Sequence, residues 1–204
     1  MKTVAIISQK GGSGKTTIAV HLAVCAERAR QRVAIIDLDP QASALEWHSR
    51  RKATTPEVIT STPEQLPALL REAKTNGADF TIIDTAPHSD RAATITANLA
   101  DLVLIPCRPA AFDVAAIGTT LNLLKLTEAK GRAAILFNAV PSRGSLTDEA
   151  EGGLSRLAVV VPVRLYHRAA YAHAVNDGRS VEEYDSRGKA AKEVRALYKW
   201  IMKR

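Results

Sequence analysis

The sequence has few cysteines and no long apolar run, and each absence excludes a class of protein. Its 204 residues include two cysteines, Cys25 and Cys107, which do not form a Cys-x-x-Cys pair. We therefore expect both to be reduced residues that pack in the interior. No apolar run approaches the roughly 20 residues of a membrane span. No signal peptide precedes the first predicted strand, so we expect a cytoplasmic protein.

The remaining composition is ordinary for a globular protein, with 46% hydrophobic and 24% charged residues. A chain of this length can form one well-buried core, and we expect a single domain over residues 1–204. Apolar β-type runs alternate with helical periodicity, which predicts parallel strands joined by right-handed crossovers. The runs are continuously apolar, as in sheets that helices cover on both faces. We predict an α/β fold with a doubly wound, mostly parallel sheet.

The segment boundaries follow from these patterns, and the part around residues 54–77 is the least regular. The predicted strands lie near 3–8, 33–37, 57–60, 79–84, 101–106, 132–139 and 157–163. The predicted helices lie near 15–30, 42–52, 64–75, 91–99, 112–130, 146–155 and 187–202.

Residues 9–17 read Gln-Lys-Gly-Gly-Ser-Gly-Lys-Thr-Thr and lie between the first predicted strand and helix. They match the phosphate-loop pattern G-x-x-x-x-G-K-[ST], except that Lys10 replaces the leading glycine. In such a loop, glycines let backbone N–H groups face phosphate oxygens at a helix N-terminus. Lys15 is then expected to reach the β- and γ-phosphates, Thr16 to ligate Mg²⁺, and Thr17 to bond near the α-phosphate. The predicted nucleotide contacts are Gly11, Gly12, Ser13, Gly14, Lys15, Thr16 and Thr17.

Carboxylates follow two other predicted strands. Asp37 and Asp39 end the run that starts at Val33, and Asp84 ends the run that starts at Phe80. In an open parallel sheet, ligands bind beyond the carboxyl ends of the strands, so these groups can converge on the phosphate loop. There an aspartate can hold Mg²⁺ or orient an attacking water. Each aspartate can instead be a helix cap or turn residue.

Lys-Gly-Gly-x-Gly-Lys-Thr-Thr resembles the deviant Walker A motif of the ParA/MinD family of P-loop ATPases. Asp37-Leu-Asp39-Pro-Gln resembles the switch I motif of that family, and Asp84 resembles its Walker B aspartate. The resemblance extends through Leu102–Pro109 to segments 174–181 and 184–190, and the short length is similar to the small partition ATPases related to ParF.

The resemblance implies a set of roles. Lys10 would cross a dimer interface and touch the nucleotide of the other subunit, although a solvated loop lysine is the alternative. Asp39 would position the hydrolytic water, and Asp37 would support the magnesium shell. The implied catalytic set is Lys10, Lys15 and Asp39, and the implied metal set is Thr16, Asp37 and Asp84. The cofactors would be ATP and Mg²⁺.

The choice of base is weakly encoded. Asn138 follows a predicted strand, and its amide could bond an adenine edge, although a turn-forming asparagine is the alternative. The resemblance places further adenine contacts near Pro162 and Val163. The chain lacks an N-K-x-D guanine signature, which favours ATP over GTP.

The positive charge is concentrated near the C-terminus. Residues 164–204 hold ten Lys and Arg against five Asp and Glu, in a chain of net charge +7. Such a cluster suits phosphate-backbone binding, but it can equally be a solvated helical face. The family resemblance implies non-specific DNA binding by an ATP-bound homodimer, although Ala170 stands where the family often has an arginine. The DNA-binding candidates are Arg164, Arg168, Arg187, Lys189, Lys192 and Arg195.

The leading hypothesis is a nucleoid-associated ATPase for plasmid or chromosome partition, stimulated by a ParB-like centromere-binding protein. No helix-turn-helix segment precedes the phosphate loop, so we expect no operator binding. A membrane-associated or protein-cargo positioning ATPase, as in MinD-like relatives, is the alternative. The last predicted helix has an apolar stripe, Val194, Leu197, Tyr198 and Ile201, that could lie on lipid. We expect this stripe to dock on the sheet instead. A metabolic P-loop ligase would need a small-molecule acceptor site, for which we find no residue set.

Overall fold

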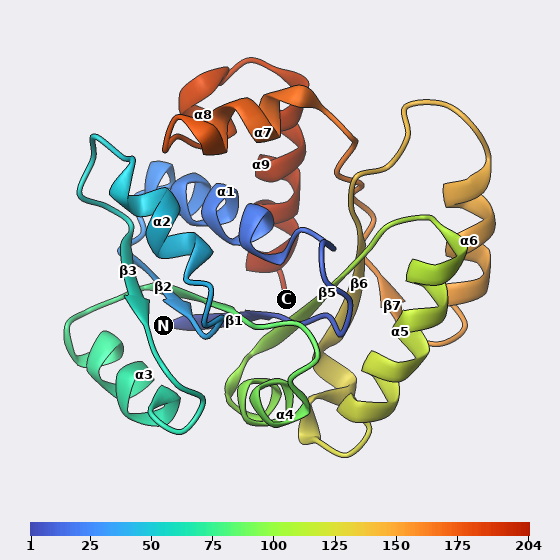
Figure 1. The fold of residues 1–204 in the computed structure, drawn as a ribbon, viewed down its shortest axis with the longest axis horizontal. Coiled ribbons are helices and arrows are strands. Elements are labelled where there is room, and N and C mark those ends of the chain that lie inside the picture. Colours follow the sequence, from blue (N-terminus) through green and yellow to red (C-terminus); the bar gives the residue numbers. More distant parts are fainter.

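A seven-stranded parallel sheet forms the centre of the molecule (Figure 1). The computed structural model describes the backbone of residues 1–204 and all side chains except those of Glu128 and Lys130. The strands run in the order β3-β2-β4-β1-β5-β6-β7, and every paired neighbour is parallel. They are β1 Lys2–Ile6, β2 Val33–Asp37, β3 Glu57–Thr60, β4 Phe80–Asp84, β5 Leu102–Cys107, β6 Ala133–Phe137 and β7 Val159–Val160.

Helices cover both faces of the sheet, which confirms the predicted fold class. In Figure 1, α1, α2, α7, α8 and α9 lie on one face, and α3, α4, α5 and α6 lie on the other. Their bounds are α1 Lys15–Arg28, α2 Ser43–Ser49, α3 Leu66–Thr75, α4 Asp90–Leu99, α5 Ala111–Leu124, α6 Leu146–Leu154, α7 Ala169–Asn176, α8 Val181–Tyr184 and α9 Lys189–Met202, with a 3₁₀ turn at Glu128–Arg132.

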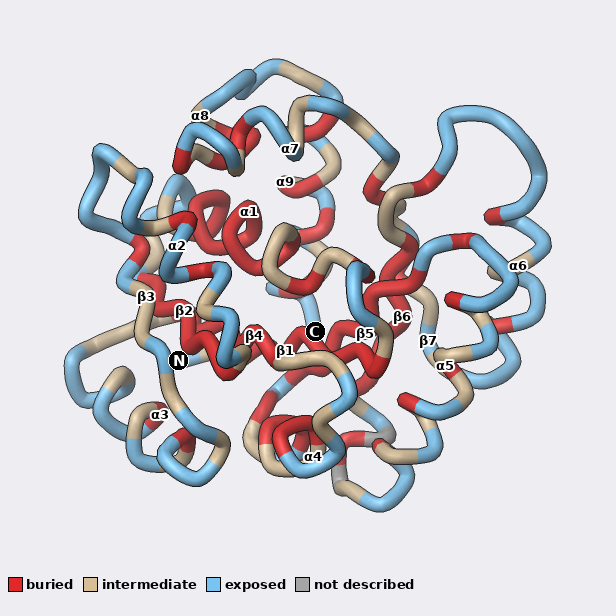
Figure 2. Tube along the Cα trace, in the orientation of Figure 1, coloured by how far each residue is buried: buried red, intermediate tan, exposed pale blue. Residues whose placement is uncertain are grey.

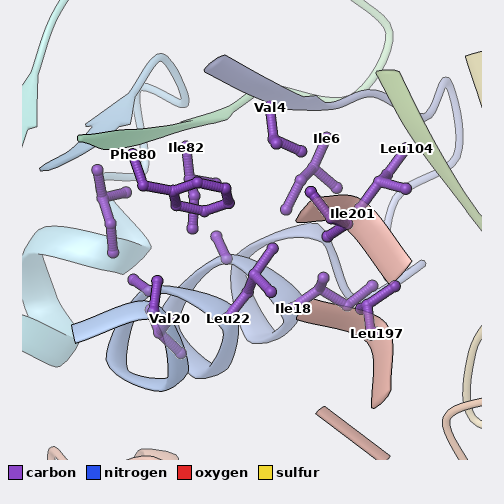
Figure 3. Close-up of a cluster of buried hydrophobic side chains, with 14 of the residues drawn as sticks. Val4, Ile6, Ile18, Val20, Leu22, Phe80, Ile82, Leu104, Leu197 and Ile201 are labelled. Atoms are coloured by element: carbon purple, nitrogen blue, oxygen red, sulfur yellow. The ribbon is translucent and has the colours of Figure 1, made fainter. Parts of the chain in front are cut away.

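Alternation along β1 explains the two cores. Val4 and Ile6 point toward α1 and α9, whereas Ala5 and Ile7 belong to the core under α4 and α5. Figure 3 shows the first core, in which Leu197 and Ile201 of α9 meet side chains of α1 and β1. The central strands β4 and β5, and β1 after its first residue, are red in Figure 2 because side chains on both of their faces are buried. The sheet is therefore a rigid base for the loops at its carboxyl edge.

The apolar stripe of the last helix packs inside the protein, as expected. Val194, Leu197 and Ile201 are at most 2% exposed, and α9 lies against α1. None of the helices in the described part of the chain has the length and apolar character of a membrane span. Both cysteines are free and buried, and burial raises their thiol pKa values to about 12.

Two predictions of secondary structure were wrong. The helix predicted over 112–130 ends at Leu124, because Thr127 is extended and its hydroxyl caps the next turn by accepting the Ala129 N–H. The helices α7 and α8 were not predicted. They are short, and the start of α8 combines a local hydrogen bond, from the Ser180 N–H to the Glu183 carboxylate, with a tertiary one, from the Val181 N–H to the buried His21 ring.

Candidate nucleotide site

The glycine-rich loop joins the end of β1 to the start of α1 at the carboxyl edge of the sheet (Figure 1). Gly12 and Gly14 have φ angles of 71° and 91°, in the left-handed region that favours glycine. Gly14 caps α1, and a Cβ there would collide with the Asn138 amide. The loop thus needs glycine at both positions to bring its N–H groups to the N-terminus of α1.

Side chains from three other elements hold the loop in place. The Asn138 amide donates to the Ser13 carbonyl at 2.7 Å, and the Arg108 guanidinium donates to the Gly12 carbonyl. Gln9 at the loop entrance donates to the Asp90 carboxylate at 2.7 Å. Sequence reasoning missed Arg108 and Asp90 as supports, because only the strand order places their elements beside the loop, and it therefore missed the role of Gln9 as well.

Lys15 is a buried cation beneath this loop. Its Nζ lies 3.5 Å from the Ser8 carbonyl, at the limit of a hydrogen bond. Burial lowers the pKa of Lys15, and the nearby charges of Asp84 and Asp39 partly oppose that shift. A buried ammonium with one long contact is suited to bind an anion such as a phosphate.

Thr16 and Asp84, two of the three residues predicted to bind metal, are joined by a hydrogen bond. The Thr16 hydroxyl donates to Asp84 Oδ2 at 2.6 Å, while the fully buried Asp84 Oδ1 has no hydrogen-bond partner among the described residues. Burial raises the pKa of Asp84 to about 7, although the Thr16 hydrogen bond opposes the shift. A divalent cation would favour the ionised carboxylate and use the free oxygen.

These residues fit Mg²⁺ bound together with a nucleotide. Mg²⁺ commonly uses one or two protein oxygens, with phosphates and water completing its octahedron. No group of three or more His, Cys, Asp and Glu that could hold a metal occurs among the residues described. A cation here would therefore depend on the nucleotide for its remaining ligands. It would supply charge to polarise the phosphates.

The two switch aspartates differ in their surroundings. Asp37 is buried, and its two oxygens accept the backbone N–H groups of Asp39 and Ala44, both at 2.9 Å. Asp37 thus acts as the turn and cap residue that was its alternative interpretation, and its magnesium role stays a prediction. Asp39 is half-buried and accepts the Gln41 N–H at 3.0 Å. The negative charge of Asp39 raises the pKa of both Lys15 and Asp84, so Asp39 lies near the same site.

Lys10 is neither free nor purely solvated. Its Nζ lies 2.5 Å from Oδ2 of Asp113 in the first turn of α5. Asp113 was not among the predicted site residues, and its place beside the loop follows from the position of β5 next to β1. The proposed reach of Lys10 to a second subunit stays a prediction.

The predicted adenine contacts lie beside β6 and β7. The amide nitrogen of Asn138 is engaged by the loop carbonyl of Ser13. Pro162 is exposed, while Val163 is half-buried against the α1 and α9 core. The structure brings this edge close to the loop through Asn138, and contact with a base stays a prediction.

The basic candidates fall into two groups. Three arginines bind acids of the same chain: Arg164 pairs with Asp148 and Glu151, Arg168 with Glu193, and Arg195 with Glu182. The other candidates, Arg187, Lys189 and Lys192, are exposed around the start of α9. The paired arginines have structural roles that sequence could not reveal, because their partners are 13 to 25 residues away.

Comparison with known proteins gives the family. Residues 4–181 match the model of the CobQ/CobB/MinD/ParA nucleotide binding domain, and the chain belongs to this family of P-loop proteins. The ParA/MinD members are ATPases that bind ATP with Mg²⁺, in agreement with the predicted cofactors.

Particular relatives show how far the similarity extends. The chain is 31% identical to the maintenance of carboxysome distribution protein A of Halothiobacillus neapolitanus, covering 93% of this chain and 90% of that protein. It is 33% identical to the protein of the same name from Gloeobacter kilaueensis, covering 98% and 92%. The MinC:MinD cell division protein complex of Aquifex aeolicus has the same fold, with a TM-score of 0.81 at 16% identity over 100% of this chain and 96% of that one.

Proposed function

We propose that the protein is an ATP-dependent dimerising switch that binds DNA without sequence preference and positions a cargo along it. The observation that carries this proposal is the second lysine of the phosphate loop, Lys10, whose side chain is 37% exposed. An ordinary P-loop has no use for a lysine five residues before Lys15. A lysine that reaches a second nucleotide would make dimerisation depend on ATP.

Hydrolysis would use the charges already gathered at the site. Lys15 and a magnesium ion at Thr16 and Asp84 would stabilise the transferred phosphoryl group, and Lys10 of the second subunit would add to them. Asp39 is half-buried, its charge acts on Lys15, and it would orient the attacking water. A ParB-like partner would stimulate this slow step, which releases the dimer from DNA.

The DNA surface is best assigned to the exposed lysines of α9. The acidic Glu193 is engaged by Arg168, and Arg195 is engaged by Glu182, so these charges largely cancel. What remains on the helix and just after its end is an exposed set of basic residues: Lys189, Lys192, Lys199, Lys203 and Arg204. Phosphate neutralisation by such a set needs no base contacts and gives binding that depends on salt.

DNA retention across a salt series tests the proposal. With ATP and Mg²⁺, the protein should bind duplexes of unrelated sequence, and affinity should fall steeply with salt. Lys192→Glu with Lys199→Glu should weaken binding by at least about tenfold without changing ATP affinity. Lys125→Glu, which reverses an exposed lysine at the end of α5, is the matched control. Absence of DNA binding at low salt would contradict the proposal.

Two kinds of cargo are candidates for this protein. Plasmid or chromosome partition is the first, and positioning of a protein body is the second. The second is favoured by the two relatives at 31% and 33% identity, which are named for carboxysome distribution. Deletion of the gene distinguishes DNA partition from the positioning of a protein body. Loss of an unselected plasmid or missegregation of the chromosome supports the first, whereas clustering of a protein body with normal DNA inheritance supports the second.

Membrane attachment through α9 has little support from the structure. The apolar face that would enter lipid is buried against α1 (Figure 3). In a co-sedimentation experiment with anionic liposomes and ATP, the protein should therefore stay in the supernatant. The same buffer should allow the protein to bind DNA in the retention assay.

A further inference from the structure

The ion pair between Lys10 and Asp113 ties the phosphate loop to α5 within one chain. The two charged atoms lie 2.5 Å apart, and the side chains are 37% and 10% exposed. The lysine is therefore the accessible partner of the pair. It can move toward solvent while Asp113 stays in place.

Asp113 has a second source of stabilisation that Lys10 lacks. It lies in the first turn of α5, where the helix dipole favours a negative charge, and its backbone N–H donates to the Ala110 carbonyl. Departure of Lys10 thus leaves the carboxylate beside a helix N-terminus rather than unpaired. A triphosphate carries more negative charge than one carboxylate and can take the lysine in exchange.

We propose that Asp113 is a positioning residue that holds Lys10 on its own subunit and so sets how much ATP is needed for dimerisation. This inference rests on the proposed function, in which Lys10 acts on the nucleotide of a second subunit. In the free monomer the pair keeps Lys10 away from that role. In the dimer both pairs must open, so their strength enters the dimerisation equilibrium twice.

The matched variant is Asp113→Asn, which removes the charge and keeps the shape. A partly exposed ion pair is weak, so each opened pair should matter only a few-fold. Because the variant removes the pair from both subunits, the protein concentration at which half the chains dimerise should fall by about tenfold. The measurement uses a slowly hydrolysed ATP analogue. ATP binding by the monomer should not change, because Lys15, Thr16 and the glycine N–H groups remain.

Two controls make the readout specific. Asp177→Asn removes another 2.5 Å ion pair, with Arg179, on an exposed surface away from Lys10, and it should dimerise like wild type. In a Lys10→Ala background, which should stay monomeric, Asp113→Asn should not restore dimerisation. Restored dimerisation would show that Asp113 opposes the dimer independently of Lys10.

Chemical labelling tests the contact without any dimer. An amine-reactive ester should modify Lys10 of the nucleotide-free protein about threefold faster in Asp113→Asn than in wild type, with Lys125 as the internal reference. Equal labelling rates would show that the pair does not hold Lys10, and would overturn the proposal.

Light scattering with the ATP analogue distinguishes the possible failures. If wild type stays monomeric, or if Lys10→Ala dimerises like wild type, the proposed function fails. If wild type dimerises and Lys10→Ala does not, the function stands, and Asp113→Asn decides the inference. A lower midpoint supports it, whereas an unchanged or higher midpoint overturns it.

Discussion

The phosphate-loop end of the sheet and the C-terminal segment 164–204 differ in whether the oxygens of their buried carboxylate groups have hydrogen-bond partners. At the loop, Asp84 Oδ1 and the hydroxyl of Ser13 are buried without a hydrogen-bond partner in the described structure. In the C-terminal segment, Glu183 accepts two hydrogen bonds of 3.0 Å from Arg51, and Glu182 accepts two from Arg195. The first region leaves a buried carboxylate oxygen without a partner, whereas the second pairs its carboxylates Glu182 and Glu183 with arginines.

This difference distinguishes residues that are available to bind a ligand from residues that stabilise the fold. A buried polar group without a partner costs stability, so a fold keeps one where a ligand completes it. A paired buried charge does no binding, but the structure depends on both partners. Changes at the loop should therefore alter nucleotide binding and leave folding intact, while changes in the C-terminal pairs should do the reverse.

The largest expected effect is on ATP binding. Lys15→Ala removes the buried cation from the phosphates, and ATP affinity should fall on the order of 1000-fold. Folding should be retained, because the hydrogen bond that Lys15 donates to the Ser8 carbonyl is at the 3.5 Å limit and contributes little. Titration with fluorescent ATP measures this, with Lys125→Ala as an exposed control. Unchanged affinity would refute the P-loop assignment.

The next effect is on stability. Glu183→Gln leaves the Arg51 guanidinium, which is 2% exposed, without its carboxylate, although it keeps its place over the Trp47 ring. The free energy of unfolding should fall by about 3 kcal/mol. Glu46→Gln breaks the exposed Arg50 pair instead and should cost less than about 0.5 kcal/mol. Urea unfolding of both variants compares the two, and equal losses would contradict the assigned burial effect.

A smaller effect is expected on turnover. Asp39→Ala should slow ATP hydrolysis about 100-fold, because a carboxylate that orients water is lost. ATP binding should persist and the ATP-bound dimer should accumulate, since Lys10 and Lys15 are untouched. Phosphate release and size-exclusion chromatography report the two quantities. A variant with wild-type turnover would remove Asp39 from the catalytic set.

The last expected effect is a change in pH dependence. Because burial raises the pKa of Asp84 to about 7, the folded state binds a proton that the unfolded state has already lost. The stability of the nucleotide-free protein should therefore fall as pH rises from about 4 to about 7, by roughly 3 kcal/mol. Asp84→Asn should lack this loss and also lack magnesium-dependent ATP binding.

Another buried group titrates in the opposite sense. Burial lowers the pKa of His21 to about 3, so its contribution to stability is lost as pH falls below about 6.5. The difference between wild type and Asp84→Asn at each pH cancels this term. A difference that does not change between pH 5 and pH 8 would contradict the assignment to Asp84.

Much of the candidate site was predictable because its groups are close in sequence. The segment from Lys10 to Thr17 contains the loop, and apolar runs ending in Asp37 and Asp84 indicate carboxylates at strand ends. Parallel strands bring such ends to one edge of the sheet, so residues 68 apart, Thr16 and Asp84, could be expected to meet. The hydrogen bonds of Asp37 to its own turn could not be distinguished from metal binding in advance.

The sequence by itself determined the strand-loop-helix unit and the apolar segments that form the central strands. It also determined the excess of basic residues near the C-terminus. Local periodicity and a contiguous glycine motif encode these features. Only the tertiary structure decided which charges are free. It engaged Arg164, Arg168 and Arg195 with acids of the same chain and placed Asp113 against Lys10. Such pairs form between elements that meet only after the sheet has assembled, so spacing along the chain does not specify them.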